Sequence, residues 1–395
     1  MSSNDVVIAG SARTPMGGMM GDLSSVRSPD LGAASIKAAI ERSGLQPADI
    51  QEVIMGCVLP GGLGQAPARQ ASRASGIPDS SGCTTVNKMC GSGMQAVIMA
   101  HDQIKAGTNS IMIAGGMENM SQAPYLLPKA RAGMRMGHGQ VMDSMFLDGL
   151  EDAYEGSLMG VFAQRTADKY DISREAADAF AVRSHQNAAR AWAEGRFDEQ
   201  LVPVEIPQRR GDPVVFARDE GFREDASMDT LGKLRAIDGK RDADAIVTAG
   251  NASQQNDAAA ACLVVAEDKV EELGLEPILW FHSWSAAGCD PSRMGIGPVP
   301  AVERLFAKTN MGWDDIGLIE LNEAFAPQAL AVLKGWGFTE DDSRRELVNV
   351  NGSGISLGHP IGATGIRILA DMAHEMQRRE VRYGLETMCI GGGQG

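Results

Sequence analysis

The residue of this chain whose type and position best suit chemistry is Cys90. It lies in the segment 85–94, where a strand-like stretch turns into a helical pattern with apolar residues at 94, 97, 98 and 104. A thiol there faces free backbone N–H groups and the positive end of a helix dipole, and both favour the nucleophilic thiolate. Most buried free cysteines are inert small apolar side chains, so Cys90 alone leaves both interpretations open.

Three further segments place polar groups on loops that follow strand-like runs. Asn322 follows an apolar run, and His359 lies in the glycine-rich turn 358–365, which opens another helical pattern. Cys389 ends a last strand-like run, just before three glycines. Together with Cys90, the segments supply two thiols, an imidazole and a carboxamide at strand ends.

These four segments, in this order and at these positions, closely resemble the thiolases, enzymes that make or break a C–C bond between two acyl-CoA units. The resemblance runs from Val6 to the last residue. It implies acetyl-CoA C-acetyltransferase activity, in which two acetyl-CoA give acetoacetyl-CoA and CoA through an acetyl group on Cys90. The alternative is a broader-chain 3-ketoacyl-CoA thiolase of fatty-acid β-oxidation, and either function belongs to fatty acid metabolism. No cofactor is implied beyond the coenzyme A thioesters.

Two more distant alternatives remain. A decarboxylating ketosynthase resembles the thiolases, but it gains its carbanion by losing CO₂ and has no need of a deprotonating thiol such as Cys389. A catalytically silent module that binds coenzyme A, or serves assembly, would keep the fold without turnover.

The resemblance implies a role for each polar group. His359 would be the base for Cys90, and would also polarise a thioester oxygen together with a water that Asn322 holds. Cys389 would exchange the α-proton of the second thioester, and the N–H groups of Gly391 and Cys90 would form the second oxyanion hole. From the residues alone, Asn322 also suits a helix N-cap and Cys389 a buried core cysteine.

For coenzyme A, the resemblance points to Arg223, whose guanidinium can lie against adenine, and to Ser253, whose hydroxyl can reach the pantetheine amide. Met159 and Phe325 would wall the acyl pocket. Apart from the resemblance, an arginine is usually a solvated charge and apolar side chains are usually core. Leu158 stands where short-chain synthetic thiolases often carry a histidine, which leaves the preferred acyl chain length open.

The composition argues against several classes of function. The 395 residues carry a net charge of −15, whereas nucleic-acid binding needs a basic surface, so we expect no nucleic-acid partner. No stretch approaches the ~18 apolar residues of a bilayer span, so we expect no membrane association. The six cysteines show no disulfide or metal-ligand spacing, and residues 1–5 show no signal peptide. We therefore expect a cytoplasmic protein with reduced thiols and no bound metal.

The chain also repeats part of its pattern. Residues 49–56 are echoed by 315–322, and 86–87 by 350–351, at offsets of 266 and 264. Each half alternates short apolar runs with helical patterns, which predicts an α/β fold with parallel or mixed sheets covered by helices. We expect an N-terminal half from 1–118 with about 245–270, an inserted loop domain at 119–245 and a C-terminal half at 271–395. The expected strands include 6–10, 52–58, 111–114 and 384–390, and the expected helices 31–43, 66–74, 91–106, 172–194 and 364–378.

Two segments predict assembly. Residues 64–70 resemble the dimer-contact loop of thiolases, and 125–147 carries more apolar residues than a loop in water should expose. The resemblance implies a homotetramer, a dimer of dimers. Thiolases also continue past the glycine run with one more strand, whereas this sequence stops at Gly395. We therefore expect an unpaired sheet edge that loosens the Gly391 N–H donor, or another segment that covers the edge.

Overall fold

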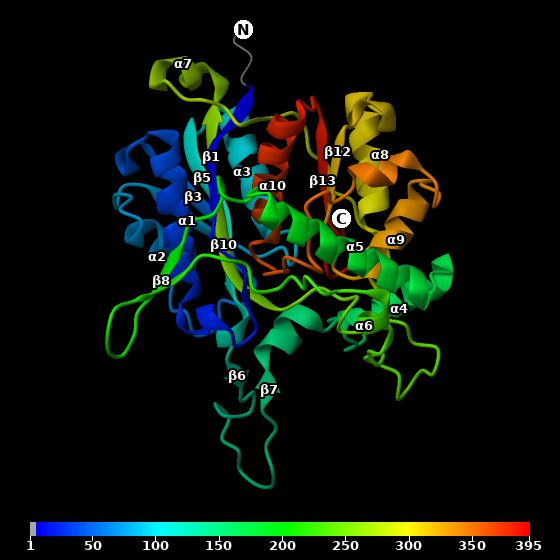
Figure 1. Cartoon of the computed structure of the whole chain (residues 1–395). Helices are drawn as coiled ribbons and strands as arrows, with labels where there is room; N and C mark the ends of the chain where they lie inside the picture. Colours follow the sequence, from blue (N-terminus) through cyan, green and yellow to red (C-terminus); the bar gives the residue numbers. More distant parts are fainter. Residues whose placement is uncertain (1–4) are drawn as a thin grey trace.

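Helices and sheets alternate in layers across the molecule (Figure 1). The computed structural model describes residues 5–395, and residues 1–4 of the expected N-terminal half lie outside the described residues. Two helices cover the outer face of a large sheet, two central helices cover its inner face, and a small sheet and a last helical layer follow. In this order the elements are α1 (Ser28–Ser43) and α2 (Pro67–Ala74), the large sheet, α3 (Ser92–Lys105) and α10 (Thr364–Arg379), β12 (Leu318–Leu321) and β13 (Gly384–Thr387), then α8 (Pro298–Thr309) and α9 (Ala326–Gly335).

The large sheet has seven strands in the order β11-β1-β10-β5-β3-β4, with β2 beside β10. β4, β3 and β5 run parallel, whereas the other pairs are antiparallel. β10 is buried along its whole length, as a central strand covered on both faces must be. The strands are β1 (Val6–Arg13), β2 (Gly17–Gly18), β3 (Glu52–Gly56), β4 (Gly82–Val86), β5 (Ile111–Asn119), β10 (Asn256–Ala266) and β11 (Leu279–Phe281).

The second half repeats the parallel part of the first. β12 pairs in parallel with β13, and Ile319 forms a parallel bridge to Val348 on the other side, which reproduces the order β4-β3-β5. Short 3₁₀ turns at Pro47–Asp49 and Trp313–Asp315 lead into β3 and β12. The duplicated α/β fold predicted from the sequence is therefore confirmed. β11 is an exception to the expected division of the chain. It lies after the expected boundary at 271, yet it pairs with β1 and adds an edge strand to the sheet of the first half.

The strands and helices expected from the sequence form, with shifted ends. The clearest difference is β5, which continues past 114 to Asn119. Gly115 lies so close to β10 that a Cβ there would be 2.5 Å from Ala260 O, so the glycines mark close packing between strands instead of a turn.

The inserted segment consists mostly of helices and short hairpins. β6 and β7 form a small hairpin whose loop projects from the body of the molecule (Figure 1). The long helix α5 packs against α9 of the second half. The elements of the inserted segment are β6 (Tyr125–Leu126), β7 (Met142–Asp143), a π-helical turn (Phe146–Leu150), α4 (Met159–Tyr170), α5 (Arg174–Ala193), β8 (Val204–Ile206), β9 (Val214–Phe216) and α6 (Met228–Gly232). Outside it, α7 (Val270–Leu273) follows β10.

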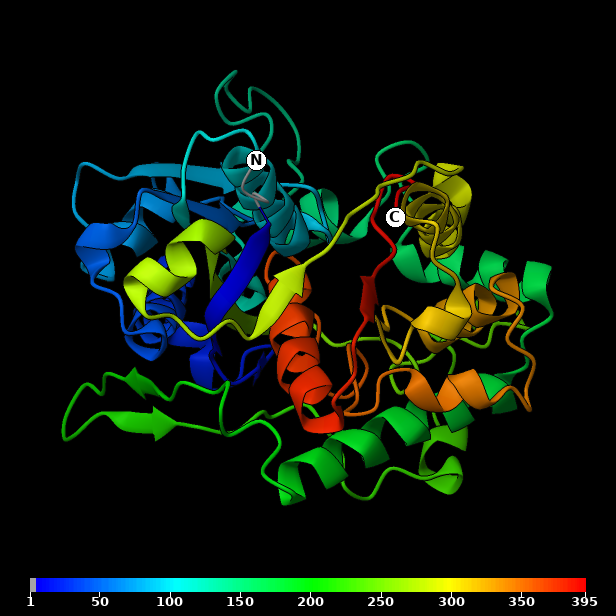
Figure 2. The same cartoon turned by 90° about the horizontal axis from the view of Figure 1, so that it is seen from above.

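The last residues fold back onto an earlier segment. Ala287 and Gly395 exchange two backbone hydrogen bonds of 3.1 and 3.0 Å, and Cys289 N–H donates to Gly393 O at 2.8 Å. Within residues 5–395, β13 pairs in its sheet only with β12. β11 lies on the far side of α10 from β13 (Figure 2). Residues of β11, α10 and β13 line a cleft of about 780 Å³. The expected open edge is therefore present. The glycine run around Gly391 is nevertheless held by these bonds.

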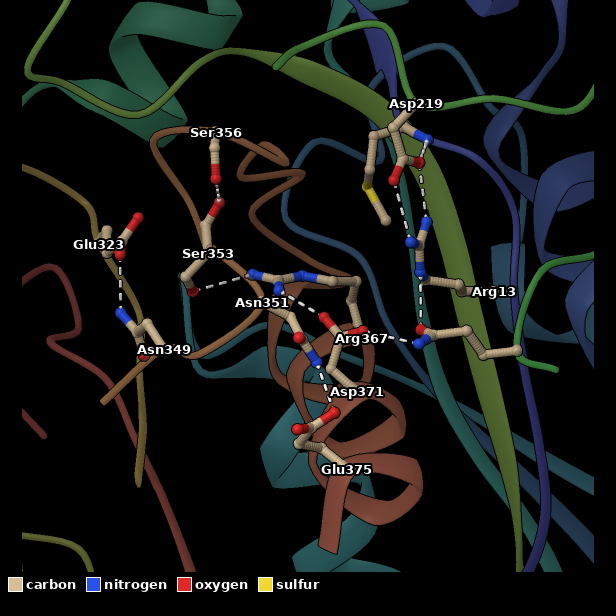
Figure 3. Close-up of polar contacts among 12 residues, drawn as sticks. Arg13, Asp219, Glu323, Asn349, Asn351, Ser353, Ser356, Arg367, Asp371 and Glu375 are labelled. Atoms are coloured by element: carbon tan, nitrogen blue, oxygen red, sulfur yellow. Dashed lines mark hydrogen bonds and ion pairs between the residues drawn. The ribbon is translucent and has the colours of Figure 1, made fainter. Parts of the chain in front are cut away.

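A chain of buried polar side chains joins the two halves (Figure 3). Arg13 on β1 forms a two-pronged ion pair with Asp219, at 2.8 and 2.9 Å, and both side chains are fully buried. Gln200 accepts from Arg13 at 2.8 Å and donates to Asp371 on α10 at 2.7 Å. Asp371 in turn accepts from Arg367 at 3.0 Å. These charge-assisted bonds hold β1, the inserted segment and α10 together.

Candidate active site

Cys90 lies two residues before α3, in a turn that its neighbours hold. Met89 has a φ of 49°, in the left-handed region that side-chain-bearing residues rarely adopt. Ser92 Oγ donates to Met89 O at 2.6 Å and accepts from Lys88 N at 2.8 Å. Strained backbone of this kind persists where surrounding bonds maintain it, and here it sets the thiol at the start of the helix.

The Cys90 thiol is neutral at rest. Burial raises its pKa to about 11, and this effect outweighs the backbone N–H groups of Gly391 and of Cys90 itself, which bond the sulfur and lower the pKa. The helix start favours the thiolate as expected, but the free-energy cost of burying the charge is larger than the gain from the N–H groups. A nucleophilic role for Cys90 would therefore need a base.

His359 is buried, and one hydroxyl bears on its tautomer. Its Nδ1 lies 2.7 Å from Thr364 Oγ1, which is also 3.0 Å from Pro360 O. When the hydroxyl donates to Pro360 O, its oxygen accepts from Nδ1–H, and the Nε2 lone pair is free to act as a base. Burial first, and then the charge of Arg367, lower the pKa of His359 to about 3, so the ring is neutral and available as a base.

The loop that carries His359 packs backbone to backbone against the first half. His359 N–H donates to Asn256 Oδ1 on β10 at 2.8 Å. Gly358 has a φ of 121°, and a Cβ there would lie 2.4 Å from the same Oδ1 atom. A Cβ at Gly116 on β5 would lie 2.1 Å from Gly362 O. Side chains at these glycines would push the loop away from the sheet.

Asn322 follows β12 and faces the histidine. Its Nδ2 lies 3.5 Å from His359 Nδ1, which is a weak contact, and its backbone N–H donates to Thr387 O at 3.0 Å. Its Oδ1 is buried and has no donor within residues 5–395. The N-cap reading of Asn322 is wrong, because Phe325 occupies that position of α9. The orphaned oxygen is the type of group that a bound water satisfies.

Cys389 is buried in an apolar pocket close to Cys90. Burial raises its pKa well above the usual value, and the charge of Cys90 raises it further. Met294 and Ala324 form a buried cluster with the thiol, and Met159 and Phe325 pack against this cluster. The structure therefore brings both predicted wall residues next to the predicted second thiol.

The two residues expected to bind coenzyme A differ in their placement. Ser253 N–H donates to Ala324 O at 2.9 Å, which puts Ser253 beside the apolar pocket. Arg223 is exposed. Its backbone N–H donates to His185 Nδ1 at 3.1 Å. Burial, and next Arg223, lower the pKa of His185 to about 4, so His185 accepts this bond as a neutral ring.

In the part of the chain that the structure describes, no group of three or more His, Cys, Asp or Glu side chains is arranged to hold a metal ion. Over the same residues, no helix has both the length and the apolar character to cross a membrane.

Most of the chain matches one known family. Residues 6–268 match the family described as Thiolase, N-terminal domain, and residues 275–395 match Thiolase, C-terminal domain. The chain belongs to the thiolase family. It is 49% identical over 391 residues to a Cupriavidus necator protein named acetyl-CoA acetyltransferase, with 99% of this chain and 98% of that protein covered. A Chromobacterium violaceum protein of the same name is 48% identical, with the same coverage.

The similarity extends to three dimensions. The crystal structure of the Bacillus anthracis acetyl-CoA acetyltransferase superposes with a TM-score of 0.94 at 40% identity, and the match covers 100% of this chain and 98% of that one. This similarity confirms the predicted thiolase fold.

Sequence reasoning missed several residues of this thiolase site. Met294 is one of 22 methionines, and nothing in the sequence separates it from the others. Asn256 lies inside a strand 103 residues before His359, so its contact with the loop is invisible without the fold. Thr364 alone had a signal, because it lies five residues after His359 at the start of a helix.

The tautomer of His359 yields a test. Thr364→Val keeps the shape of the side chain but removes the acceptor for Nδ1–H of His359. We expect alkylation of Cys90 by iodoacetamide at pH 7 to slow by about 10-fold, because the loss of one hydrogen bond has an effect of about that size. Thr364→Ser restores the hydroxyl and serves as the matched control, with a rate near that of the wild type. Equal alkylation rates for the valine variant and the wild type would contradict the assignment.

Proposed function

We propose that this thiolase is an acetyl-CoA C-acetyltransferase, which reversibly joins two acetyl-CoA molecules into acetoacetyl-CoA and CoA. The observation that carries the proposal is the pair of thiols, half-buried Cys90 and buried Cys389, close enough for the charge of one to shift the pKa of the other. A condensation needs one group to hold the acyl unit and another to move the α-proton, so two thiols at one site suit it. The printed names of the two bacterial relatives support the same substrate.

The first half-reaction loads Cys90. His359 Nε2 takes the proton of Cys90, and the thiolate attacks the thioester carbon of acetyl-CoA. The N–H groups of Gly391 and Cys90, which already bond the sulfur, stabilise the oxyanion that forms. The C–S bond to CoA then breaks, Cys389 gives its proton to the CoA sulfur, and an acetyl group remains on Cys90.

The second half-reaction forms the new C–C bond. The Cys389 thiolate removes an α-proton from a second acetyl-CoA, whose enolate oxygen accepts hydrogen bonds from protonated His359 and from a water held by Asn322. The orphaned Oδ1 of Asn322 supports this role for the water. The enolate carbon attacks the acetyl carbon on Cys90, the C–S bond breaks, and His359 returns its proton. The protons balance, and coenzyme A thioesters are the only groups required besides the protein.

The charges of the two thiols suit this sequence of steps. Burial raises the pKa of Cys389, and a thiolate at Cys90 raises it further. Acetylation removes the charge of Cys90, so Cys389 can lose its proton more readily once the acetyl group is in place. A thiolate that forms in a buried site is also a stronger base than one in water.

We assign binding roles to the neighbouring residues on the same basis. Met159 and Phe325 wall the acyl pocket, since both pack against the Cys389 cluster. Ser253 lies beside the same pocket and suits the pantetheine amide, and exposed Arg223 suits the adenine. We place the enzyme in the cytoplasm, in keeping with six free cysteines among the described residues. A reaction between acyl-CoA units belongs to fatty acid metabolism.

The acetyl-enzyme can be tested directly. Incubation with radiolabelled acetyl-CoA should leave label on the peptide that contains Cys90, because the acetyl group stays on sulfur until a second thioester arrives. Cys90→Ser should carry no label and should lose turnover at least about 10³-fold. Cys83→Ser, a change at a half-buried thiol outside the site, is the control. Normal turnover of the Cys90 variant would disprove the proposal.

The alternative function, a broader-chain 3-ketoacyl-CoA thiolase, differs only in the acyl pocket. Met159, Met294 and Phe325 crowd the space next to Cys389, which favours a small acyl group. We therefore expect kcat/KM for thiolysis of acetoacetyl-CoA to exceed that for 3-ketohexadecanoyl-CoA by at least about 10-fold. A preference for the long chain would establish the alternative.

We also propose a homotetramer built as a dimer of dimers. In the segment 125–147, Tyr125 is 68% exposed and Met136 is 97% exposed, whereas Met145 packs into its own domain. Exposed apolar side chains on the projecting hairpin suit burial against another copy. Light scattering should give about four times the chain mass, and deletion of 129–140 should leave an active dimer. A monomeric intact protein would refute the proposal.

A further inference from the structure

The carboxylate of Glu118 connects two segments of the active site, although it lies on a strand behind it. Glu118 is the penultimate residue of β5 and is 0% exposed. Its Oε2 accepts from the backbone N–H groups of Val58 and Gly362, each at 2.9 Å. Its Oε1 accepts from Leu59 N–H at 3.1 Å and lies 3.8 Å from the thiol of Cys57.

The two segments held in this way meet at Cys90. Val58 and Leu59 come directly after β3 and form a buried cluster with Ile361, and Cys90 packs against this cluster. Gly362 belongs to the loop that carries His359, three residues earlier in the chain. The side chain of Glu118 therefore connects the segment 58–59, which packs against Cys90, to the loop that carries His359.

The donors around Glu118 match a carboxylate, although burial disfavours its charge. Three backbone N–H groups point at its two oxygens, and a carboxylate offers only acceptors. Burial raises the pKa of Glu118 to about 7, while the same three N–H groups lower it and favour the charge. A carboxamide of the same shape would turn an NH₂ donor toward at least one of those N–H groups, so at least one bond would be lost.

The space around the contact makes the position of the loop sensitive to this bond. A Cβ at Gly362 would lie 2.6 Å from Glu118 Oε2, so nothing larger than hydrogen fits between the loop and the carboxylate. If the N–H bond of Gly362 is lost, the loop is no longer drawn against β5.

We propose that Glu118 is a positioning residue, whose carboxylate sets His359 relative to Cys90 by accepting the N–H of Gly362. The proposal rests on the role of His359 as the base for Cys90. It deepens the proposed function by adding a group that touches neither substrate nor thiol at the reaction centre.

The test compares Glu118→Gln with Glu375→Gln, which removes another buried carboxylate. Glu375 lies in the last turns of α10 and binds Arg196 of the inserted segment and Arg378 and Arg379 of α10. We expect Glu118→Gln to lower kcat and the rate of Cys90 alkylation by iodoacetamide at pH 7 by at least about 10-fold, with KM for acetoacetyl-CoA changed less than about twofold. Glu375→Gln should lower the melting temperature and leave both rates near wild type. Gly362→Ala, which disturbs the same contact from the loop side, should reproduce the two rate losses.

Three outcomes separate the possibilities. If Glu118→Gln melts earlier but keeps the wild-type alkylation rate per folded molecule, the carboxylate is only structural and the proposal fails. If Glu118→Gln does not fold, a wild-type alkylation rate in Gly362→Ala would overturn it. If His359→Gln leaves the alkylation rate of Cys90 unchanged, the role of His359 as the base fails first, whatever Glu118 does.

Discussion

The structure depends on two arginines that have no access to water. A guanidinium cannot shed its charge, so Arg13 and Arg367, each 0% exposed, must find carboxylates in the interior. Asp219 and Asp371 supply them, and Gln200 bridges the two pairs. Since these groups come from β1, the inserted segment and α10, none of the three can be removed without leaving a buried charge unpaired. The interaction therefore couples the folding of the two halves.

The position of His359 follows from that coupling. Arg367 lies in the first turn of α10, and the loop with His359 leads directly into that helix. Where the loop meets the first half, Gly116 and Gly362 bring the two backbones into direct contact. The polar network fixes the helix from one side, and the glycine contact fixes the loop from the other. The histidine thus needs little help from its own side-chain bonds to be placed.

The sequence alone predicted what is local or repeated. The residues Cys90, Asn322, His359 and Cys389 stand in short motifs, and the offset of 266 residues predicted that β12 repeats β3. Properties that depend on burial could not be predicted from the sequence. The pKa of Cys90 moved in the opposite direction to the one a helix start predicts, because desolvation depends on every atom around the sulfur. The contact of Glu118 with Gly362 spans 244 residues, and β11 joined a sheet whose other strands come earlier in the chain.

The two central helices share an orientation that has an electrostatic consequence. α3 begins two residues after Cys90, and α10 begins five residues after His359, so both present their N-termini at the site. Each N-terminus carries a partial positive charge of roughly half a proton, formed by fixed peptide dipoles. A protein with a net charge of −15 can thereby offer a positive potential to a forming oxyanion from its backbone. Such a potential belongs to the backbone, so neither pH nor the choice of surface side chains alters it.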